Sequence, residues 1–149
     1  MEDVENIINK YNLPNLTELY AEFGVFDPKE DEDFIKNVIE KLSDKVHNYI
    51  KFFEDIIQPD STIVSMSESS IFENEERKEI VHILKKLIYY ERLYLKININ
   101  GTIQEKADYF NDYFQNWIEL KTKIIPFVNK TIDLWKNDTD ESKFEMYFG

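Results

Sequence analysis

Apolar residues recur every three or four positions along most of this chain, which is the spacing of one face of an α-helix. The longest pattern of this kind begins at Thr102 and ends at Trp135. It carries two apolar stripes that are offset by about 100°, so this central helix should contact neighbours on two sides. The first stripe is Ile103, Ala107, Phe110, Phe114, Trp117, Ile124, Val128, Ile132 and Trp135, and the second is Tyr109, Tyr113, Leu120, Phe127 and Leu134.

Local signals mark the start of this helix and one irregularity within it. Thr102 and Glu105 have the spacing of a capping box, in which two side chains satisfy backbone N–H groups at the helix start. Gly101 supplies a turn immediately before it. Pro126 lacks an N–H group and should kink or break the helix near Ile125.

Two further long helices are predicted. The first opens at Asp27 and Pro28 and continues to Pro59, and the second opens at a capping box formed by Ser70 and Glu73 and continues to about Ile97. The serine-rich stretch 60–69 between them is predicted to be a loop. Because only residues 98–101 connect the second helix to the central one, the two should pack antiparallel.

Two short helices precede the long ones. The first covers Asp3 to Tyr11, and the second has Pro14 in its first turn and ends at Gly24. The sequence therefore predicts an all-α fold: an antiparallel bundle of three long helices plus two short N-terminal helices and an acidic C-terminal tail. We expect one helical-bundle domain over residues 1–136, followed by an acidic and aromatic tail over residues 137–149.

Charge narrows the choice of partners. The chain has 149 residues, with 30 acidic and 18 basic side chains and a net charge of −12. The first 60 residues hold 15 of these acids and 6 of these bases. Direct binding to nucleic acid or to an anionic membrane is disfavoured, because both need compensating cations, whereas a basic protein partner is favoured.

The absence of cysteine and of any long apolar run excludes several kinds of site and protein. There is no cysteine, which excludes disulfides, thiolate metal sites and cysteine nucleophiles, and we expect no cofactor. No run approaches the roughly 20 apolar residues of a membrane span. We expect an intracellular, soluble protein of the cytoplasm or nucleus.

The two histidines each follow an acidic residue by three positions, as Asp44 with His47 and Glu79 with His82. This spacing resembles the Glu-x-x-His pairs of di-iron carboxylate bundles. Both histidines, however, share helical stripes with polar residues, namely Glu40, Ser43, Lys51 and Glu54 for His47, and Lys78, Glu79, Lys85 and Lys86 for His82. We therefore expect both to face solvent, and predict no metal site.

Arg77 and His82 are separated by four residues in the segment ERKEIVH. This pair resembles the Arg-(four residues)-His motif of HEPN-type helical ribonucleases. The resemblance implies phosphodiester cleavage by acid–base chemistry and charge stabilisation at Arg77 and His82. A ribonuclease centred on these two residues is therefore the enzymatic alternative.

The segment ESKFEMYF near the C-terminus resembles the sliding-clamp-binding peptide called the PCNA-interacting box. Tyr147 and Phe148 match its aromatic pair and Phe144 takes its aliphatic position. The resemblance implies that Phe144, Tyr147 and Phe148 contact a protein partner, such as a sliding clamp. The structural alternative is that Phe144, Met146 and Phe148 fold back on the bundle as a short amphipathic helix.

The polar helical faces show no convergent catalytic set. The leading hypothesis is a non-catalytic adaptor or accessory subunit that binds a protein partner through an acidic surface and its C-terminal peptide. The alternatives are the HEPN-like ribonuclease and an inhibitor that mimics the charge of nucleic acid. The oligomeric state and the partner's identity do not follow from the sequence.

Overall fold

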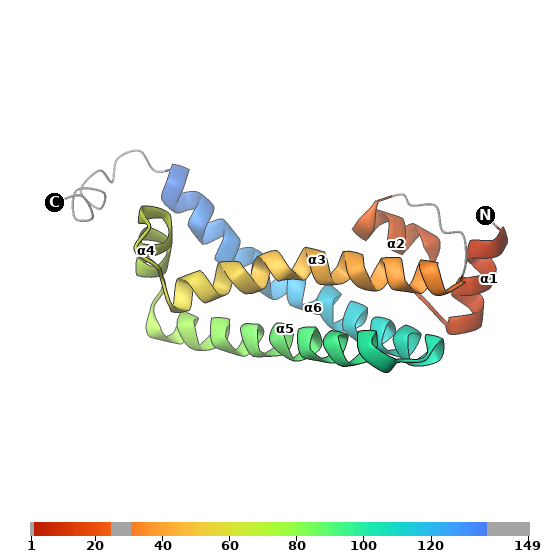
Figure 1. Cartoon of the computed structure of the whole chain (residues 1–149). Coiled ribbons are helices and arrows are strands. Elements are labelled where there is room, and N and C mark those ends of the chain that lie inside the picture. The colour runs from red at the N-terminus through yellow and green to blue at the C-terminus, as the bar shows by residue number, and fades with distance from the viewer. Residues whose placement is uncertain (1, 25–30, 137–149) are drawn as a thin grey trace. The chain divides into compact units, whose positions relative to one another are not determined.

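The computed structural model describes residues 2–24 and 31–136, which form six helices and no strand (Figure 1). The all-α prediction is therefore confirmed. The predicted helix start at Asp27 and Pro28 and the tail 137–149 lie outside the described residues. The helices are α1 (Glu2–Tyr11), α2 (Leu16–Phe23), α3 (Asp31–Ile57), α4 (Ile63–Ser70), α5 (Asn74–Asn100) and α6 (Ile103–Lys136).

The chain divides into two compact units. The N-terminal unit comprises Met1–His47 and Tyr89–Ile118, and the C-terminal unit comprises Asn48–Ile88 and Glu119–Gly149. Segments of α3, α5 and α6 contribute to both units, and α5 runs opposite to the other two (Figure 1). Each unit thus contains an antiparallel arrangement of three long-helix segments, while the single domain over residues 1–136 stays a prediction.

The core of the N-terminal unit is rich in aromatic side chains. Phe34, Phe110, Tyr113 and Trp117 are completely buried together with Leu19 of α2. The short helix α1 docks through residues at helical spacing, and all of these are buried: Val4, Ile7, Ile8 and Tyr11. Neither α1 nor α2 is long enough to be stable alone in water, so this burial is what holds them in place.

Helix α2 begins at Leu16, two residues after Pro14. Asn15 is the N-cap, and its Oδ1 accepts a hydrogen bond from the Glu18 N–H at 2.8 Å. Pro14 therefore precedes the cap, and its predicted place in the first helical turn is wrong, because the amide side chain of Asn15 satisfies the helix start. Gly24 ends the helix as predicted, at φ +80°, and its N–H donates to the Tyr20 carbonyl at 2.8 Å.

The turn between α5 and α6 is tight, as predicted. The Gly101 N–H donates to the Ile97 carbonyl at 2.8 Å, and a Cβ on residue 101 would lie only 2.6 Å from that oxygen. Glycine is therefore required there. Thr102 then caps α6 by accepting a hydrogen bond from the Glu105 N–H at 3.1 Å.

In the C-terminal unit, the predicted loop 60–69 is wrong because most of it forms α4. Thr62 is the N-cap, and its Oγ1 accepts from the Ser65 N–H at 3.2 Å. The serine hydroxyls of α4 face inward and donate to the last carbonyls of α3: Ser65 to Asp55 at 3.3 Å and Ser69 to Ile56 at 2.6 Å. Three serines of this helix are buried: Ser65, Ser67 and Ser69.

The predicted capping box at Ser70 and Glu73 is also wrong. Ser70 is the last residue of α4, and its hydroxyl donates to the Ser67 carbonyl at 2.7 Å. Helix α5 starts at Asn74, and the Glu73 N–H donates instead to Glu76 Oε1 at 3.1 Å. Glu76 also binds Lys130 of α6 at 2.7 Å, which ties the start of α5 to α6.

Arg77 holds the corner where α3, α4 and α5 meet. Its guanidinium donates to the carbonyls of Ile56 at 3.0 Å and Phe72 at 3.1 Å, and to both the carbonyl and the hydroxyl of Ser69. The carbonyls at a helix C-terminus have no partner within their own helix, so one cationic side chain here satisfies several of them.

Helix α6 is continuous through Pro126, so the chain does not break near Ile125, while the alternative of a kink there stays a prediction. Its second half buries Leu120, Ile124, Phe127 and Thr131. Ile132 and Trp135 are instead 54% and 37% exposed, so their predicted place on the buried stripe is wrong. Each four-residue step advances about 40° around the helix, so the step from Val128 to Ile132 leaves the buried face.

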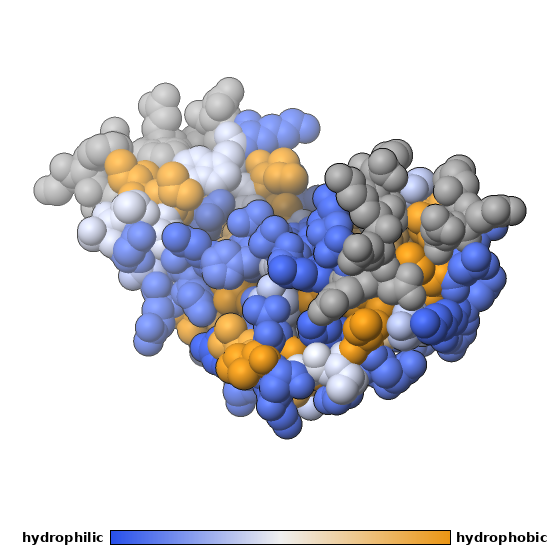
Figure 2. Space-filling model, turned by 45° about the vertical axis from the view of Figure 1, so that its right-hand side comes forward, coloured by the Kyte–Doolittle hydropathy of each residue, from blue (hydrophilic) through white to orange (hydrophobic). Residues whose placement is uncertain are grey.

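The surface is dominated by polar side chains. On the face drawn in Figure 2, hydrophilic residues predominate and apolar residues form separate patches. Among the described residues, no helix is long and apolar enough to cross a membrane.

We predict that Arg77→Met lowers the free energy of unfolding by about 2–4 kcal/mol, because it leaves several carbonyls without their charged donor. Urea denaturation measures the effect. Lys78→Met is the matched control: Lys78 makes only an exposed pair with Glu75, so its replacement should change stability by less than about 0.5 kcal/mol. Equal losses in the two variants would contradict the role assigned to Arg77.

Candidate functional site

A groove of about 660 Å³ opens on the N-terminal unit. Its walls come from the α1–α2 connection, from α2 and from α6. Two of the apolar lining residues are buried and the others reach the surface; the apolar set is Leu13, Pro14, Ala21, Phe114 and Ile118. The polar set contains two carboxylates and consists of Asn12, Glu18, Glu22, Asn111 and Gln115. The groove thus offers both apolar contact and hydrogen-bond acceptors.

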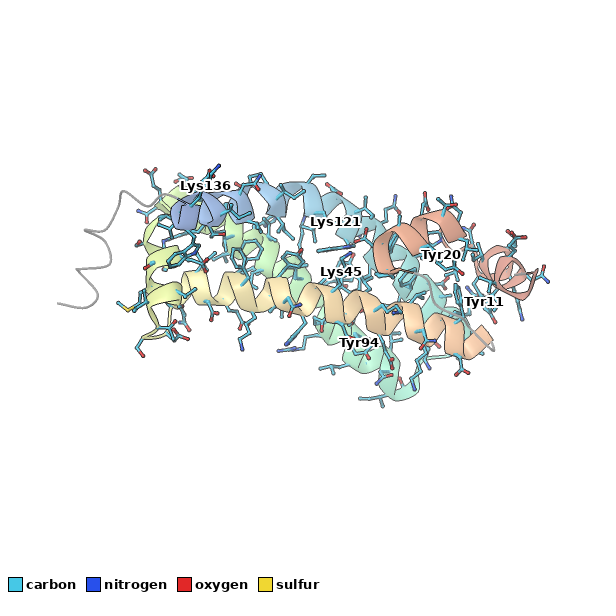
Figure 3. All side chains as sticks on the ribbon, turned by 90° about the horizontal axis from the view of Figure 1, so that it is seen from above. Tyr11, Tyr20, Lys45, Tyr94, Lys121 and Lys136 are labelled. Atoms are coloured by element: carbon cyan, nitrogen blue, oxygen red, sulfur yellow. The ribbon has the colours of Figure 1, made fainter. Side chains whose placement is uncertain are left out.

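Glu22 fixes the position of α2 against the rest of the unit. Its Oε1 accepts a hydrogen bond from Trp117 Nε1 of α6 at 2.7 Å and an ion pair from Lys45 Nζ of α3 at 2.9 Å. Lys45 also donates to the Glu22 carbonyl at 2.7 Å, and it projects from α3 toward α2 (Figure 3). The Glu22 side chain is only 8% exposed, so this carboxylate is a structural anchor of the groove wall.

Asn111 lines the groove and joins α6 to α1. Its Nδ2 donates to the Tyr11 carbonyl of α1 at 3.2 Å. Its Oδ1 is buried and makes no hydrogen bond within the described part of the chain. A buried acceptor without a donor is costly, and because this oxygen has almost no accessible surface it belongs to the interior of the unit rather than to the ligand-facing surface of the groove.

The charge of this unit suits a cationic ligand. Sixteen acidic and eight basic residues give the N-terminal unit a net charge of −8, against −4 for the C-terminal unit, which has fourteen and ten. Glu18 is exposed at the groove, and Ile118, which also lines it, is 41% exposed. The site is therefore equipped to hold a segment that carries apolar side chains and positive charge.

A second polar cluster lies in the interior of the N-terminal unit. The rings of Tyr90 and Tyr113 stack with centroids 4.4 Å apart, and Tyr113 donates its hydroxyl to Glu91 Oε1 at 3.3 Å. Tyr109 donates to the Tyr90 carbonyl at 2.7 Å, and Tyr90 donates to Asp112 at 2.9 Å. These phenol groups tie α5 to α6.

Burial sets the protonation states in this cluster. Desolvation raises the pKa of Glu91 above its usual value, although Ser43, Tyr113 and His47 oppose the shift. Desolvation also raises the pKa of the three phenols, so that they stay neutral. The cluster is a network of neutral donors around one half-buried carboxyl, which serves helix packing.

The predicted histidine positions are exposed. His47 in the N-terminal unit and His82 in the C-terminal unit both reach solvent, as their helical stripes predict, whereas Ser43 of the same stripe as His47 is buried. No group of three or more His, Cys, Asp or Glu side chains placed to hold a metal occurs within residues 2–24 and 31–136.

The structure describes two of the other predicted site residues, Arg77 and His82. Arg77 uses its guanidinium on backbone carbonyls, while His82 is exposed on the same helix. Phe144, Tyr147 and Phe148 lie outside the described residues, so the predicted docking peptide stays a prediction.

Sequence reasoning missed the groove itself. Glu22 and Trp117 are 95 positions apart, and Tyr11 and Asn111 are 100 apart, so neither pairing has a local pattern. Two signals were available: a buried tryptophan needs an acceptor for its indole N–H, and an asparagine amid buried aromatic residues of a helix calls for a tertiary partner.

Comparisons of this chain with protein families, with curated proteins and with solved structures found no match.

We predict that Glu22→Ala lowers the free energy of unfolding by about 2–4 kcal/mol, because it removes the buried carboxylate that pairs with the Lys45 ammonium and accepts from the Trp117 indole N–H. Glu18→Ala, one turn earlier on α2, is the control and should cost less than about 0.5 kcal/mol. The measurement is chemical denaturation followed by circular dichroism. A Glu22 variant as stable as the control would contradict the anchoring role.

We predict that Glu91→Gln alters the pH dependence of stability. Because the folded-state pKa of Glu91 is raised, the wild-type protein should lose stability as pH rises from about 4.5 through that pKa. The glutamine variant lacks this titration, so its stability relative to wild type should increase over the same window. Denaturation series from pH 4 to pH 8 measure the difference, and identical pH profiles for the two proteins would contradict the raised pKa of Glu91.

Proposed function

We propose that this protein is a non-catalytic adaptor or accessory subunit that binds a cationic segment of a partner protein in the N-terminal groove. The observation that carries the proposal is the combination of an apolar lining and the exposed carboxylate of Glu18 on a unit of net charge −8. The proposed setting is the cytoplasm or nucleus, and direct binding of nucleic acid is not part of the proposal.

Two physical contributions support this kind of binding. The negative charge of the unit attracts a basic partner over a distance and raises the association rate, typically by 10–10³-fold at low salt. Pro14, Ala21 and Ile118, which reach the surface, then offer apolar area for close contact. Because charge acts mainly on encounter and apolar burial on residence, the complex should weaken with salt without being abolished.

Two variants of the proposal differ in the partner. One is an inhibitor that mimics the charge of nucleic acid and occupies the basic surface of a nucleic-acid-binding protein. The other is binding to a sliding clamp through Phe144, Tyr147 and Phe148. We favour the inhibitor, because the groove that it would use is lined by residues that the structure describes, whereas Phe144, Tyr147 and Phe148 lie outside them.

The enzymatic alternative is the HEPN-like ribonuclease centred on Arg77 and His82. Its arginine would have to stabilise charge on a phosphodiester. Instead, Arg77 directs its donors to the carbonyls of Ile56, Ser69 and Phe72, which favours the adaptor proposal. RNA cleavage by the purified protein that is lost in His82→Ala would favour the ribonuclease.

The groove can be tested by site-specific crosslinking, because the chain has no cysteine of its own. Gln115→Cys places a photoreactive maleimide at the groove, and Lys96→Cys places the same probe at an exposed position of the same unit outside the groove lining. We predict that a defined basic protein in native extract crosslinks to the first probe and not to the second, as read by mass spectrometry.

A charge variant provides the control for general electrostatics. Glu18→Lys at the groove should weaken capture about tenfold, whereas Glu79→Lys, which changes the net charge equally but lies in the C-terminal unit, should have little effect. Capture that is equal from both probes, or equally sensitive to both charge variants, would contradict binding in the groove.

A further inference from the structure

An exposed apolar stripe follows the second half of α6 in the C-terminal unit. We define the α6 outer stripe as Ile125, Ile132 and Trp135, which are 54%, 54% and 37% exposed. Ile125 and Ile132 are seven residues apart and so lie on one side of the helix, about 10 Å from each other along its axis. Their immediate neighbours Ile124 and Thr131 are buried, so this helix is apolar on two different sides.

The α6 outer stripe contacts α4 at one end. Trp135 Nε1 donates to Glu68 Oε2 of α4 at 2.9 Å. Val64, one turn before Glu68 on the same side of α4, is 56% exposed. The indole hydrogen bond therefore brings the end of the stripe next to α4, a helix that carries an exposed apolar residue of its own. Such an accumulation of exposed isoleucine, valine and tryptophan is a recognised mark of a contact surface.

The position of residues 137–149 in the chain makes them the nearest segment that could cover the α6 outer stripe. Residues 137–149 follow directly from Lys136, the last residue of α6, and only one residue separates them from Trp135. The stripe from Ile125 to Trp135 is about 15 Å long. After a reversal of three or four residues, the remaining nine or ten could extend over about 14 Å as a helix or about 30 Å as a strand, so the segment can cover it.

Charge and side-chain type support the same occupant. Segment 137–149 holds four acidic residues and one lysine, for a net charge of −3. The part of α6 from Glu119 to Lys136 holds four lysines and two acids, for a net charge of +2, in a chain whose net charge is −12. Lys121 and Lys136 lie at the two ends of the stripe, each one turn beyond an isoleucine (Figure 3).

The apolar content of the segment matches the stripe. Phe144, Tyr147 and Phe148 have the i, i+3, i+4 spacing of a single helical face. We propose that residues 137–149 dock on the α6 outer stripe of the same chain, with these aromatic side chains covering Ile125, Ile132 and Trp135.

Hydrogen exchange measured by mass spectrometry tests this contact in the full chain. The double variant Ile125→Ser/Ile132→Ser removes the apolar surface at two exposed positions, and Leu95→Ser, a residue 53% exposed in the N-terminal unit, is the matched control. We expect amides of residues 141–148 to exchange about tenfold faster in the double variant than in wild type or in the control. Equal exchange in all three proteins would overturn the proposal.

A second measurement leaves the stripe intact and identifies whose segment covers it. Ser142→Cys carries a spin label on an otherwise cysteine-free chain. We expect the methyl signals of Ile125 and Ile132 to broaden in the labelled chain itself, independently of concentration. Broadening that appears only when labelled chains are mixed with isotope-enriched unlabelled ones would assign the stripe to a second copy and overturn docking within one chain.

These outcomes are independent of the groove. The stripe belongs to the C-terminal unit and the groove to the N-terminal unit, so crosslinking at Gln115 can succeed whether or not the segment docks.

Discussion

The buried carboxylate of Glu22 is the contact on which the N-terminal unit depends. It accepts hydrogen bonds from Trp117 of α6 and Lys45 of α3 while it belongs to α2, a helix of eight residues that could not persist alone. A carboxylate withdrawn from water is stable only when its donors are in place, so α2 has one favourable position against α3 and α6. The groove between α2 and α6 is a consequence of that position.

Long helices were predictable because their signals are local. Apolar spacing and the cap at Thr102 lie within a few residues of the elements that they define, and the structure confirms both. Helix α4 was not predictable in this way, because its inward face is made of serines whose donors satisfy carbonyls of α3. Ile132 and Trp135 were misplaced because apolar spacing identifies a helical face but does not say which side has a neighbour.

The candidate groove escapes sequence reasoning for a related reason. Its walls come from segments about 100 positions apart, and the contact between Asn111 and Tyr11 exists only once the unit has folded. Composition did indicate the acidic character of this part of the chain. At Arg77 the sequence pattern points to a function that the contacts do not favour. Its spacing from His82 resembles a catalytic motif, but its guanidinium donates to three backbone carbonyls. The charge of the residue alone does not distinguish a catalytic arginine from a structural one.

The chain has only two tryptophans, and they fall in different units. Trp117 is completely buried beside a carboxylate in the N-terminal unit, whereas Trp135 is partly exposed in the C-terminal unit. Each unit therefore has its own natural fluorescent reporter, one in an apolar environment and one in partial contact with water. The spectral maxima of the two indoles should differ, so the emission spectrum can reveal whether the two halves of the chain melt together or in sequence.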